Sequence, residues 1–251
     1  SSPKTMCDQK KFTIVIPTRD RGDTLVHTLA SALSQDYDNF VVLVSDNASN
    51  DNTHELVSKL NDDRIQYINT GRRLSMSQNW EFALNHVHDG WITILGDDDA
   101  ILPAALKTVN KIIDETGTLA IRSNGCSYSW PRINGGQFGK LTISLKRGYR
   151  TVRSQTALEN VMYGKSRYTT LPVLYNGGFV QASLIDRARS VTGRFFLSMV
   201  PDVYSAIVFA FLTDEYIYSD APLAINGASH HSGGTAMFEA AKKNRHYCPI
   251  E

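Results

Sequence analysis

Apolar runs and polar loops alternate along the first hundred residues of the chain. Four apolar or alternating runs predict strands, at residues 12–16, 40–44, 64–68 and 91–95. Apolar residues at helical spacing predict three intervening helices, around residues 25–33, 56–60 and 80–87. Strand and helix in regular alternation are typical of an open, mostly parallel α/β sheet of Rossmann-like type with helices on both faces.

Local signals predict where several elements begin and end. Pro17 directly follows the first apolar run, and we expect it to end that strand because proline cannot donate a ladder hydrogen bond. Asp23 is placed to cap the next helix. Asn52 with Glu55 resembles a capping box at the start of the second helix.

The pattern is less regular in the second half of the chain. We expect helices around residues 103–115, 156–163, 184–185 and 201–209, and strands at residues 119–122, 215–218 and 223–225. The glycine-rich residues 124–150 predict either a lid over a ligand or a solvent-facing hairpin. Residues 227–234 predict a flexible polar loop.

Polar residues follow each of the first four predicted strands. In an open parallel sheet, ligands bind beyond the carboxyl ends of the strands. The loops that begin at Pro17, Ser45, Gly71 and Gly96 should therefore share one edge. This edge would bring together basic and acidic side chains from all four loops. They are Arg19 of the first loop, Asp46 of the second, Arg72 or Arg73 of the third, and Asp97, Asp98 and Asp99 of the fourth.

Three consecutive carboxylates, Asp97, Asp98 and Asp99, end the fourth strand after Gly96. Like charges at this spacing repel one another unless a cation, donors or water offset them. Mg²⁺ and Mn²⁺ prefer oxygen ligands and often bind through one or two carboxylates plus substrate phosphates. Taken alone, the triplet is more often a solvated turn before the helix that starts near Pro103.

Composition narrows the class of protein. The chain has 251 residues, 42% of them hydrophobic, and a net charge of +1, which predicts one globular unit and implies neither a nucleic-acid nor an anionic-membrane partner. Cys7, Cys126 and Cys248 are scattered without metal-ligand spacing, which favours reduced thiols and a cytosolic setting. No apolar run approaches the ~20 residues that span a bilayer, and no signal-peptide core is present.

Four segments in order resemble one family. IVIPT at 14–18, VSDNASNDNT at 44–53, LGDDD at 95–99 and PDVY at 201–204 are similar to motifs of the family 2 glycosyltransferases, inverting enzymes of the GT-A fold. The resemblance covers roughly residues 10–235. It implies a single GT-A domain over residues 1–251, with a nucleotide-sugar-binding half at 10–100 and an acceptor-binding and catalytic half at 101–251.

The resemblance implies a nucleotide site at the first loops. Pro17, Thr18 and Arg19 would contact the base and ribose. Asp46 would accept a hydrogen bond from a pyrimidine N–H, which fits a UDP- or dTDP-sugar donor. The pair Arg72 and Arg73 would supply a basic residue near the base or diphosphate.

The resemblance also implies roles for the acidic positions. Asp97 or Asp98 would approach the ribose or sugar, and Asp99 would hold Mn²⁺ or Mg²⁺ against the diphosphate. Asp202 would be the catalytic base; without the family match, a helix-capping role is favoured. His230 or its neighbour His231 either completes the metal shell or is solvated.

The chain departs from the family pattern in two segments. Asn47 and Ala48 follow Asp46 where relatives commonly have a second acid and a glycine, and Pro201 precedes Asp202 where an acid is frequent. A second acidic contact to the base is therefore not expected, and Asp202 alone must act as the base.

Together, the residues and the resemblance predict a function. We expect a metal-dependent, inverting glycosyltransferase that moves a sugar from a nucleotide-sugar donor to a glycan or lipid-linked glycan acceptor in bacterial surface polysaccharide synthesis. Such an acceptor would bring a cytoplasmic enzyme to the inner face of the membrane. Trp130 is a candidate for stacking on the acceptor sugar, whereas Trp80 and Trp91 are expected in the core.

Two other classes stay open. A sugar-phosphate nucleotidyltransferase would also use a nucleotide edge and a metal, but it usually has a glycine-rich loop after the first strand, where this chain has Pro17 to Arg21. A non-catalytic sugar- or Ca²⁺-binding module would leave Asp46 and Asp202 unexplained.

Overall fold

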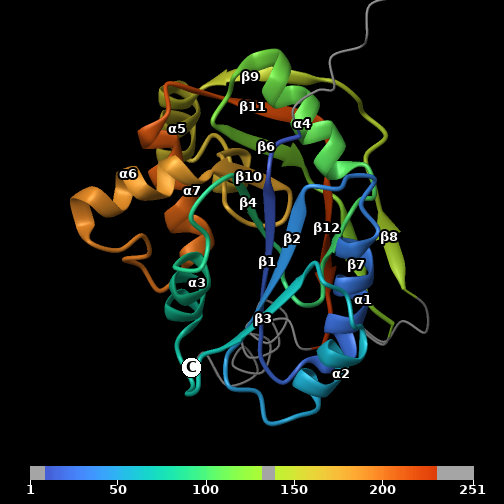
Figure 1. The fold of residues 1–251 in the computed structure, drawn as a ribbon. Helices are drawn as coiled ribbons and strands as arrows, with labels where there is room; N and C mark the ends of the chain where they lie inside the picture. The colour runs from blue at the N-terminus through green and yellow to red at the C-terminus, as the bar shows by residue number, and fades with distance from the viewer. Residues whose placement is uncertain (1–8, 132–138, 231–251) are drawn as a thin grey trace, which may run out of the picture.

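A large mixed sheet forms the centre of the computed structural model, which describes residues 9–131 and 139–230 (Figure 1). Its strand order is β3-β2-β1-β4-β10-β6-β11-β9. The bounds are β1 (Phe12–Thr18), β2 (Phe40–Asp46), β3 (Ile65–Asn69), β4 (Trp91–Ile94), β6 (Ala120–Asn124), β9 (Tyr149–Arg153), β10 (Gly178–Gln181) and β11 (Glu215–Pro222). Neighbours among β3, β2, β1 and β4 are parallel, whereas β10 is antiparallel to both β4 and β6.

A smaller sheet lies beside the first. Its order is β5-β12-β7-β8, with β5 (Ala100–Ile101), β12 (Ala224–Ala228), β7 (Ser127–Ser129) and β8 (Lys140–Thr142). Because β7 and β8 pair in antiparallel fashion, the glycine-rich stretch contains the hairpin pairing that was one of its two interpretations. Residues 132–138 between these strands lie outside the described residues.

Helices cover both faces of the large sheet, as the alternating pattern predicted. The helices are α1 (Gly22–Leu33), α2 (Thr53–Lys59), α3 (Met76–Leu84), α4 (Ala105–Thr116), α5 (Ser154–Met162), α6 (Ala182–Thr192) and α7 (Pro201–Leu212). Buried residues of α1, α2 and α4 pack in one apolar cluster, and those of α3, α6 and α7 in another. Figure 1 shows α1 and α2 to the right of β1 and β2, and α3, α6 and α7 to the left.

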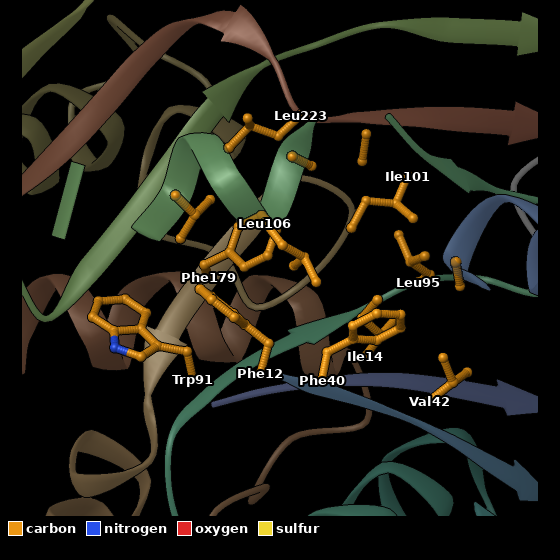
Figure 2. Packing of buried hydrophobic residues seen from close by; sticks show 14 of the residues in the cluster. Phe12, Ile14, Phe40, Val42, Trp91, Leu95, Ile101, Leu106, Phe179 and Leu223 are labelled. Atoms are coloured by element: carbon orange, nitrogen blue, oxygen red, sulfur yellow. The ribbon is translucent and has the colours of Figure 1, made fainter. Parts of the chain in front are cut away.

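The strands run through the interior with apolar side chains on both faces. In β1, Phe12, Ile14 and Ile16 face the α1 and α4 side, whereas Val15 faces the α3 side. Figure 2 shows Phe12 and Ile14 among the cluster on the first face, with Leu106 of α4 above them. A strand whose two faces are both covered by helices is expected to be a continuous apolar run, as β1 is. Trp80 and Trp91 are buried, as predicted.

The expectation for Pro17 was wrong, because β1 continues through it to Thr18. The carbonyl of Val15 accepts a hydrogen bond from Leu95, so odd-numbered residues of β1 direct their backbone groups toward β4. β4 ends at Ile94. The nitrogen of Pro17 therefore points toward the side of β4, beyond the end of that strand. No backbone carbonyl of β4 lies opposite it, so the missing N–H of proline costs no ladder hydrogen bond.

Two predicted caps are also corrected. The residue that precedes α1 is Arg21, and Asp23 lies inside the first turn. Asn52 precedes α2 but makes no side-chain capping bond. Asp51 takes that role instead, since its carboxylate accepts from the backbone N–H of Thr53 at 3.1 Å and from the Thr53 hydroxyl.

Candidate functional site at the carboxyl edge

The carboxyl end of β1 lies directly against the acidic triplet. The Thr18 hydroxyl donates to Asp97 Oδ2 at 2.8 Å, and Arg21 Nη1 forms an ion pair with Asp97 Oδ1 at 2.9 Å. Burial raises the pKa of Asp97, and the Arg21 charge and the two hydrogen bonds oppose that rise. Thr18 at the end of β1 and Arg21 in the loop after it thus offset part of the cost of burying this charge.

Asp99 is held by backbone donors from two distant segments. Its Oδ2 accepts from the N–H of Gly96 at 2.8 Å, and its Oδ1 accepts from the N–H of Gly227 at 2.7 Å. The hydroxyl of Tyr175 lies beside this carboxylate and favours its charged form. Burial and the neighbouring Asp98 charge raise the pKa of Asp99 to about 7, despite these donors.

Asp98 is bound to the end of β12. Its Oδ2 accepts from the hydroxyl of Ser229 at 2.6 Å and from the Ser229 N–H at 3.3 Å. Trp130 Nε1 donates to the Asp98 carbonyl at 3.1 Å. Trp130 therefore packs over the backbone of the triplet. Its stacking on an acceptor sugar stays a prediction.

The three carboxylates are consequently buried between β1 and β12, with 3%, 7% and 3% of Asp97, Asp98 and Asp99 exposed. The expectation of a solvated acidic turn is wrong. The expectation of a flexible loop is also wrong for residues 227–229, because Gly227 lies in β12 and Ser229 is fully buried; residues 231–234 lie outside the described residues. A Cβ atom at Gly227 would overlap the Asp98 carbonyl oxygen, so this close approach requires glycine.

The second loop forms the neighbouring part of the edge. In the β1–β2 register Thr18 lies opposite Asp46. Asp46 is 1% exposed; its Oδ1 accepts from the Ser49 N–H at 2.8 Å and its Oδ2 from the Tyr67 hydroxyl. Asp46 is therefore a fixed, oriented carboxylate at the end of β2.

Asn47 occupies the position where relatives commonly have a second acid. Its Nδ2 donates to the Leu74 carbonyl at 2.9 Å, and its Oδ1 accepts from the Leu74 N–H at 2.7 Å. The loop that carries Arg72 and Arg73 is thereby fastened to the Asp46 loop. Both arginines are exposed.

Arg19 projects from the same edge with unused hydrogen-bonding capacity. Its Nε donates to Asp20 at 3.2 Å, but its Nη1 is buried without a hydrogen-bond partner. A buried guanidinium nitrogen that lacks an acceptor is costly, so an anionic or polar ligand here would be stabilising. His230 is exposed beside Ser229, and His231 lies outside the described residues.

Asp202 lies on a different element, in the first turn of α7. The Tyr168 hydroxyl donates to its Oδ2 at 2.6 Å. The side chain of Asp202 is partly exposed. This position is suited to a group that accepts a proton from a ligand.

The structure thus brings together most, but not all, of the predicted set. Thr18 and the acidic triplet are in direct contact, and the Asp46 and arginine loops adjoin them through β1 and Asn47. Three participants were missed, namely Arg21, Tyr175 and Ser229. Arg21 could have been found from its place in the loop after β1, whereas no sequence motif marks the other two.

The oxygen donors at the triplet fit a hard divalent cation. Among residues 9–131 and 139–230, no group of three or more His, Cys, Asp or Glu side chains is arranged to hold a metal ion. Mg²⁺ and Mn²⁺ in nucleotide sites need only one or two protein carboxylates, because phosphates and water supply the rest. The raised pKa of Asp99 reflects a buried charge that a cation would stabilise.

Comparison with known proteins places the chain in a family. The model for glycosyl transferase family 2 matches residues 13–168, more than half of the chain. The chain therefore belongs to glycosyl transferase family 2, a family of sugar-transferring enzymes, as the four segments predicted.

Curated relatives match part of the chain. The GalNAc(5)-diNAcBac-PP-undecaprenol β-1,3-glucosyltransferase of Campylobacter jejuni is 32% identical over 108 residues, which is 42% of this chain and 35% of that protein. WfaP of Escherichia coli, a UDP-Glc:α-D-GlcNAc-diphosphoundecaprenol β-1,3-glucosyltransferase, is 31% identical over 86 residues, 34% of each protein. The chain thus spans about a third of the length of these relatives.

Solved structures share the fold. S. aureus TarS in complex with UDP-GlcNAc matches with a TM-score of 0.67 at 17% identity, covering 88% of this chain and 60% of that one. The mannosyltransferase PcManGT from Pyrobaculum calidifontis, in complex with GDP-Man and Mn²⁺, matches with a TM-score of 0.61 at 15% identity, covering 97% and 66%. The predicted GT-A fold is confirmed. No helix in the described part of the chain is long and apolar enough to cross a membrane.

Proposed function

We propose that this chain is an inverting, divalent-metal-dependent glycosyltransferase domain that moves a sugar from a nucleotide-sugar donor to a glycan or lipid-linked glycan acceptor. The observation that carries the proposal is the acidic triplet, buried at the carboxyl edge between β1 and β12 in a member of this family. Residues 10–100 bind the donor, and residues 101–251 supply the acceptor side and the base.

The nucleotide binds at the ends of β1 and β2. Pro17, Thr18 and Arg19 contact the base and ribose, and a ligand oxygen satisfies the unpaired Nη1 of Arg19. Asp46, oriented by Ser49 and Tyr67, accepts the N–H of a pyrimidine. The nucleotide sugar that suits the Asp46 carboxylate best is therefore a UDP- or dTDP-sugar. The TarS complex with UDP-GlcNAc supports a uridine donor.

The diphosphate lies between the acidic triplet and the arginine loop. Asp99 holds Mn²⁺ or Mg²⁺ with help from His230, and Asp97 or Asp98 contacts the ribose or sugar. When bound, such a cation would stabilise the negative charge of the departing diphosphate, and no side chain would need to protonate it. Exposed Arg72 or Arg73 adds a second positive charge. The Mn²⁺ present in the PcManGT complex supports this choice of ion.

Asp202 is the base. The acceptor oxygen forms its bond to the anomeric carbon as the bond from that carbon to the diphosphate oxygen breaks, and the electron pair leaves with the nucleoside diphosphate. Attack opposite the leaving group inverts the configuration. The acceptor proton goes to Asp202, whose Oδ2 is oriented by Tyr168.

The acceptor is the least constrained component. Two curated relatives are named for undecaprenol-linked diphosphate glycans, which supports a lipid-linked acceptor and a role in bacterial surface polysaccharide synthesis. The domain would then meet its acceptor at the inner face of the membrane through peripheral association. Trp130, beside the triplet, is placed to stack on a sugar ring.

A thermal-shift panel tests the proposal. UDP-, dTDP- and GDP-sugars are compared with and without Mn²⁺, because a ligand of the native state raises its stability by mass action. We expect a pyrimidine nucleotide sugar with Mn²⁺ to raise the melting temperature. Pyrophosphate release from a nucleoside triphosphate and a sugar phosphate would instead identify a nucleotidyltransferase. A shift with glycans and none with nucleotides would identify a binding module.

A further inference from the structure

Residues 168–177 connect the two ends of the proposed reaction site. This segment, here called the tyrosine connector, precedes β10 and begins with the short 3₁₀ helix Tyr168–Thr170. The Tyr168 hydroxyl donates to Asp202 at 2.6 Å, and the Tyr175 hydroxyl lies beside the Asp99 carboxylate, where both approach Gly96. One short segment therefore contacts both the proposed base and the proposed metal ligand.

The backbone of the connector binds the same two elements. The N–H of Leu174 donates to Ser205 Oγ at 3.1 Å, and Ser205 is a fully buried residue of α7 one turn after Asp202. The N–H of Asn176 donates to the carbonyl of Ile94, the last residue of β4, at 2.8 Å. α7 and the end of β4 are thus joined by main-chain as well as side-chain bonds.

Arg122 of β6 joins the two ends of the connector. Its Nε donates to the Thr169 carbonyl at 2.8 Å, and its Nη1 donates to the carbonyls of Tyr175 at 2.9 Å and Asn176 at 2.8 Å. The side chain is buried, which lowers the pKa of Arg122 to about 10, and no carboxylate of the described residues forms an ion pair with it. A buried charge held by carbonyl groups is costly, so stability alone gives little reason for it.

Both tyrosine rings are held by packing. Tyr175 stacks on Trp80 with ring centroids 5.6 Å apart. Tyr168 packs against the cluster that contains Ala206 and Ala210 of α7. Because each ring has few freely rotating bonds, this packing fixes where the two hydroxyls lie.

We propose that Arg122 and the tyrosine connector form one positioning unit that sets the spacing between Asp99 and Asp202. This inference rests on the proposed function, in which Asp99 serves the leaving diphosphate and Asp202 the attacking hydroxyl. An in-line displacement needs these groups on opposite sides of the anomeric carbon, and a displacement of ~1 Å can cost ~10²-fold in rate. Arg122, Tyr168 and Tyr175 act through the two aspartates and are positioning residues.

The two tyrosines predict different kinetic effects. Tyr168→Phe releases Asp202, so kcat should fall roughly tenfold or more while the KM for the donor stays close to wild type. Tyr175→Phe releases Asp99, so the Mn²⁺ concentration for half-maximal activity should rise roughly tenfold, with kcat largely restored at saturating Mn²⁺. A general loss of stability would not separate the two parameters in this way.

Tyr37→Phe is a matched control. The Tyr37 hydroxyl is buried and bonds the Lys10 carbonyl at 2.7 Å and Asn110 at 2.9 Å, beyond the opposite end of β1. Its removal should lower the melting temperature and leave both kcat and the Mn²⁺ requirement unchanged. If Tyr37→Phe shifts either parameter as the connector variants do, the inference is overturned.

Arg122→Lys tests the unit as a whole. Lysine keeps the charge but cannot donate to three carbonyls in fixed directions. We expect both a lower kcat and a higher Mn²⁺ requirement, and a combined Arg122→Lys and Tyr168→Phe variant that loses less than the product of the single effects. If Arg122→Lys does not fold, the tyrosine variants alone decide the question.

The outcomes separate this inference from the proposed function. If the wild-type domain neither binds a nucleotide sugar with Mn²⁺ nor transfers its sugar, the proposed function fails, and the inference fails with it. If the wild-type domain is active but Tyr168→Phe and Tyr175→Phe change the same parameter, or change neither, only the positioning unit is refuted.

Discussion

At the scale of single residues, the carboxyl edge is a balance between buried carboxylates and their donors. Asp97 has the Arg21 cation and the Thr18 hydroxyl, and Asp98 has Ser229. Asp99 is buried, lies beside the Asp98 charge and has only neutral donors, so its pKa is raised. Burial of the triplet therefore costs folding stability, as expected of the ligand site that we propose here.

The Asp99 carboxylate predicts a pH dependence of the metal-free protein. Its folded pKa of about 7 lies above the ordinary aspartate value of about 3.9, so the folded state binds more protons than the unfolded state in this range. Stability should therefore rise as the pH falls from 8 to 6, by about 1 kcal/mol. Chemical denaturation of the metal-free domain at the two pH values measures this.

The same experiment has an internal control. Asp99→Ala removes the titrating carboxylate, so the gain between pH 8 and pH 6 should shrink in that variant. Stability that instead falls on acidification over this interval, or a gain that is unchanged in Asp99→Ala, would show that Asp99 is charged throughout the range.

Asp202→Asn tests the base. The amide cannot take a proton, so release of the nucleoside diphosphate from the donor in the presence of acceptor should fall by ~10²- to 10⁴-fold. Binding of the nucleotide should be retained, because Asp202 lies on α7, away from the nucleotide loops.

Asp23→Asn is the matched control for this variant. Asp23 also lies in the first turn of a helix, and its replacement loses a similar interaction with the helix dipole, worth ~0.3–1 kcal/mol. Equal turnover in the two variants would leave Asp202 with only a helix-stabilising role.

The candidate residues that the sequence revealed share one property. Asp46 and the acidic triplet directly follow apolar runs, so their place at the strand ends could be predicted from local pattern. Tyr175 and Ser229 have no such mark. Each meets the triplet from a segment more than 75 residues further along the chain, so only the tertiary fold pairs them.

At the scale of elements, the end of β12 is the part of the site that the sequence analysis missed, since it predicted a strand at residues 223–225 only. A run of small and polar residues from Gly227 is typical of a flexible loop, yet Gly227 and Ala228 form the end of β12, which lies between β5 and β7. Small residues are needed because the strand passes close to the Asp98 backbone. Composition that normally indicates flexibility thus reflects a close backbone approach.

Gly227→Ala should disrupt this contact. Its Cβ would overlap the Asp98 carbonyl oxygen, so β12 must move and the N–H bond to Asp99 is lost. We expect a loss of ~1–3 kcal/mol in the free energy of unfolding and weaker nucleotide binding with Mn²⁺. Gly125→Ala is the control, because a Cβ there meets nothing within 4 Å. Similar effects of the two substitutions would refute the close approach.

At the scale of the whole molecule, the two halves of the sheet differ in how far they could be predicted. β1 to β4 alternate with helices, so a parallel arrangement follows from the local pattern. The order β10-β6-β11-β9 mixes parallel and antiparallel neighbours and joins strands far apart in the chain. No local pattern encodes that order. The helices and strands of this half could therefore be predicted, but not the order and direction of its strands in the sheet.

The central claim is that this edge binds a nucleotide through a metal held by Asp99. Calorimetric titration of UDP into the wild-type domain, with and without Mn²⁺, tests it most directly. Asp99→Ala should lose the Mn²⁺-dependent binding, and Asp36→Ala should keep it, since Asp36 is exposed and pairs with Lys107 on the surface. Wild-type binding that requires Mn²⁺ and disappears only in Asp99→Ala is the predicted result; binding of UDP with Mn²⁺ that is equally tight in Asp99→Ala would contradict it.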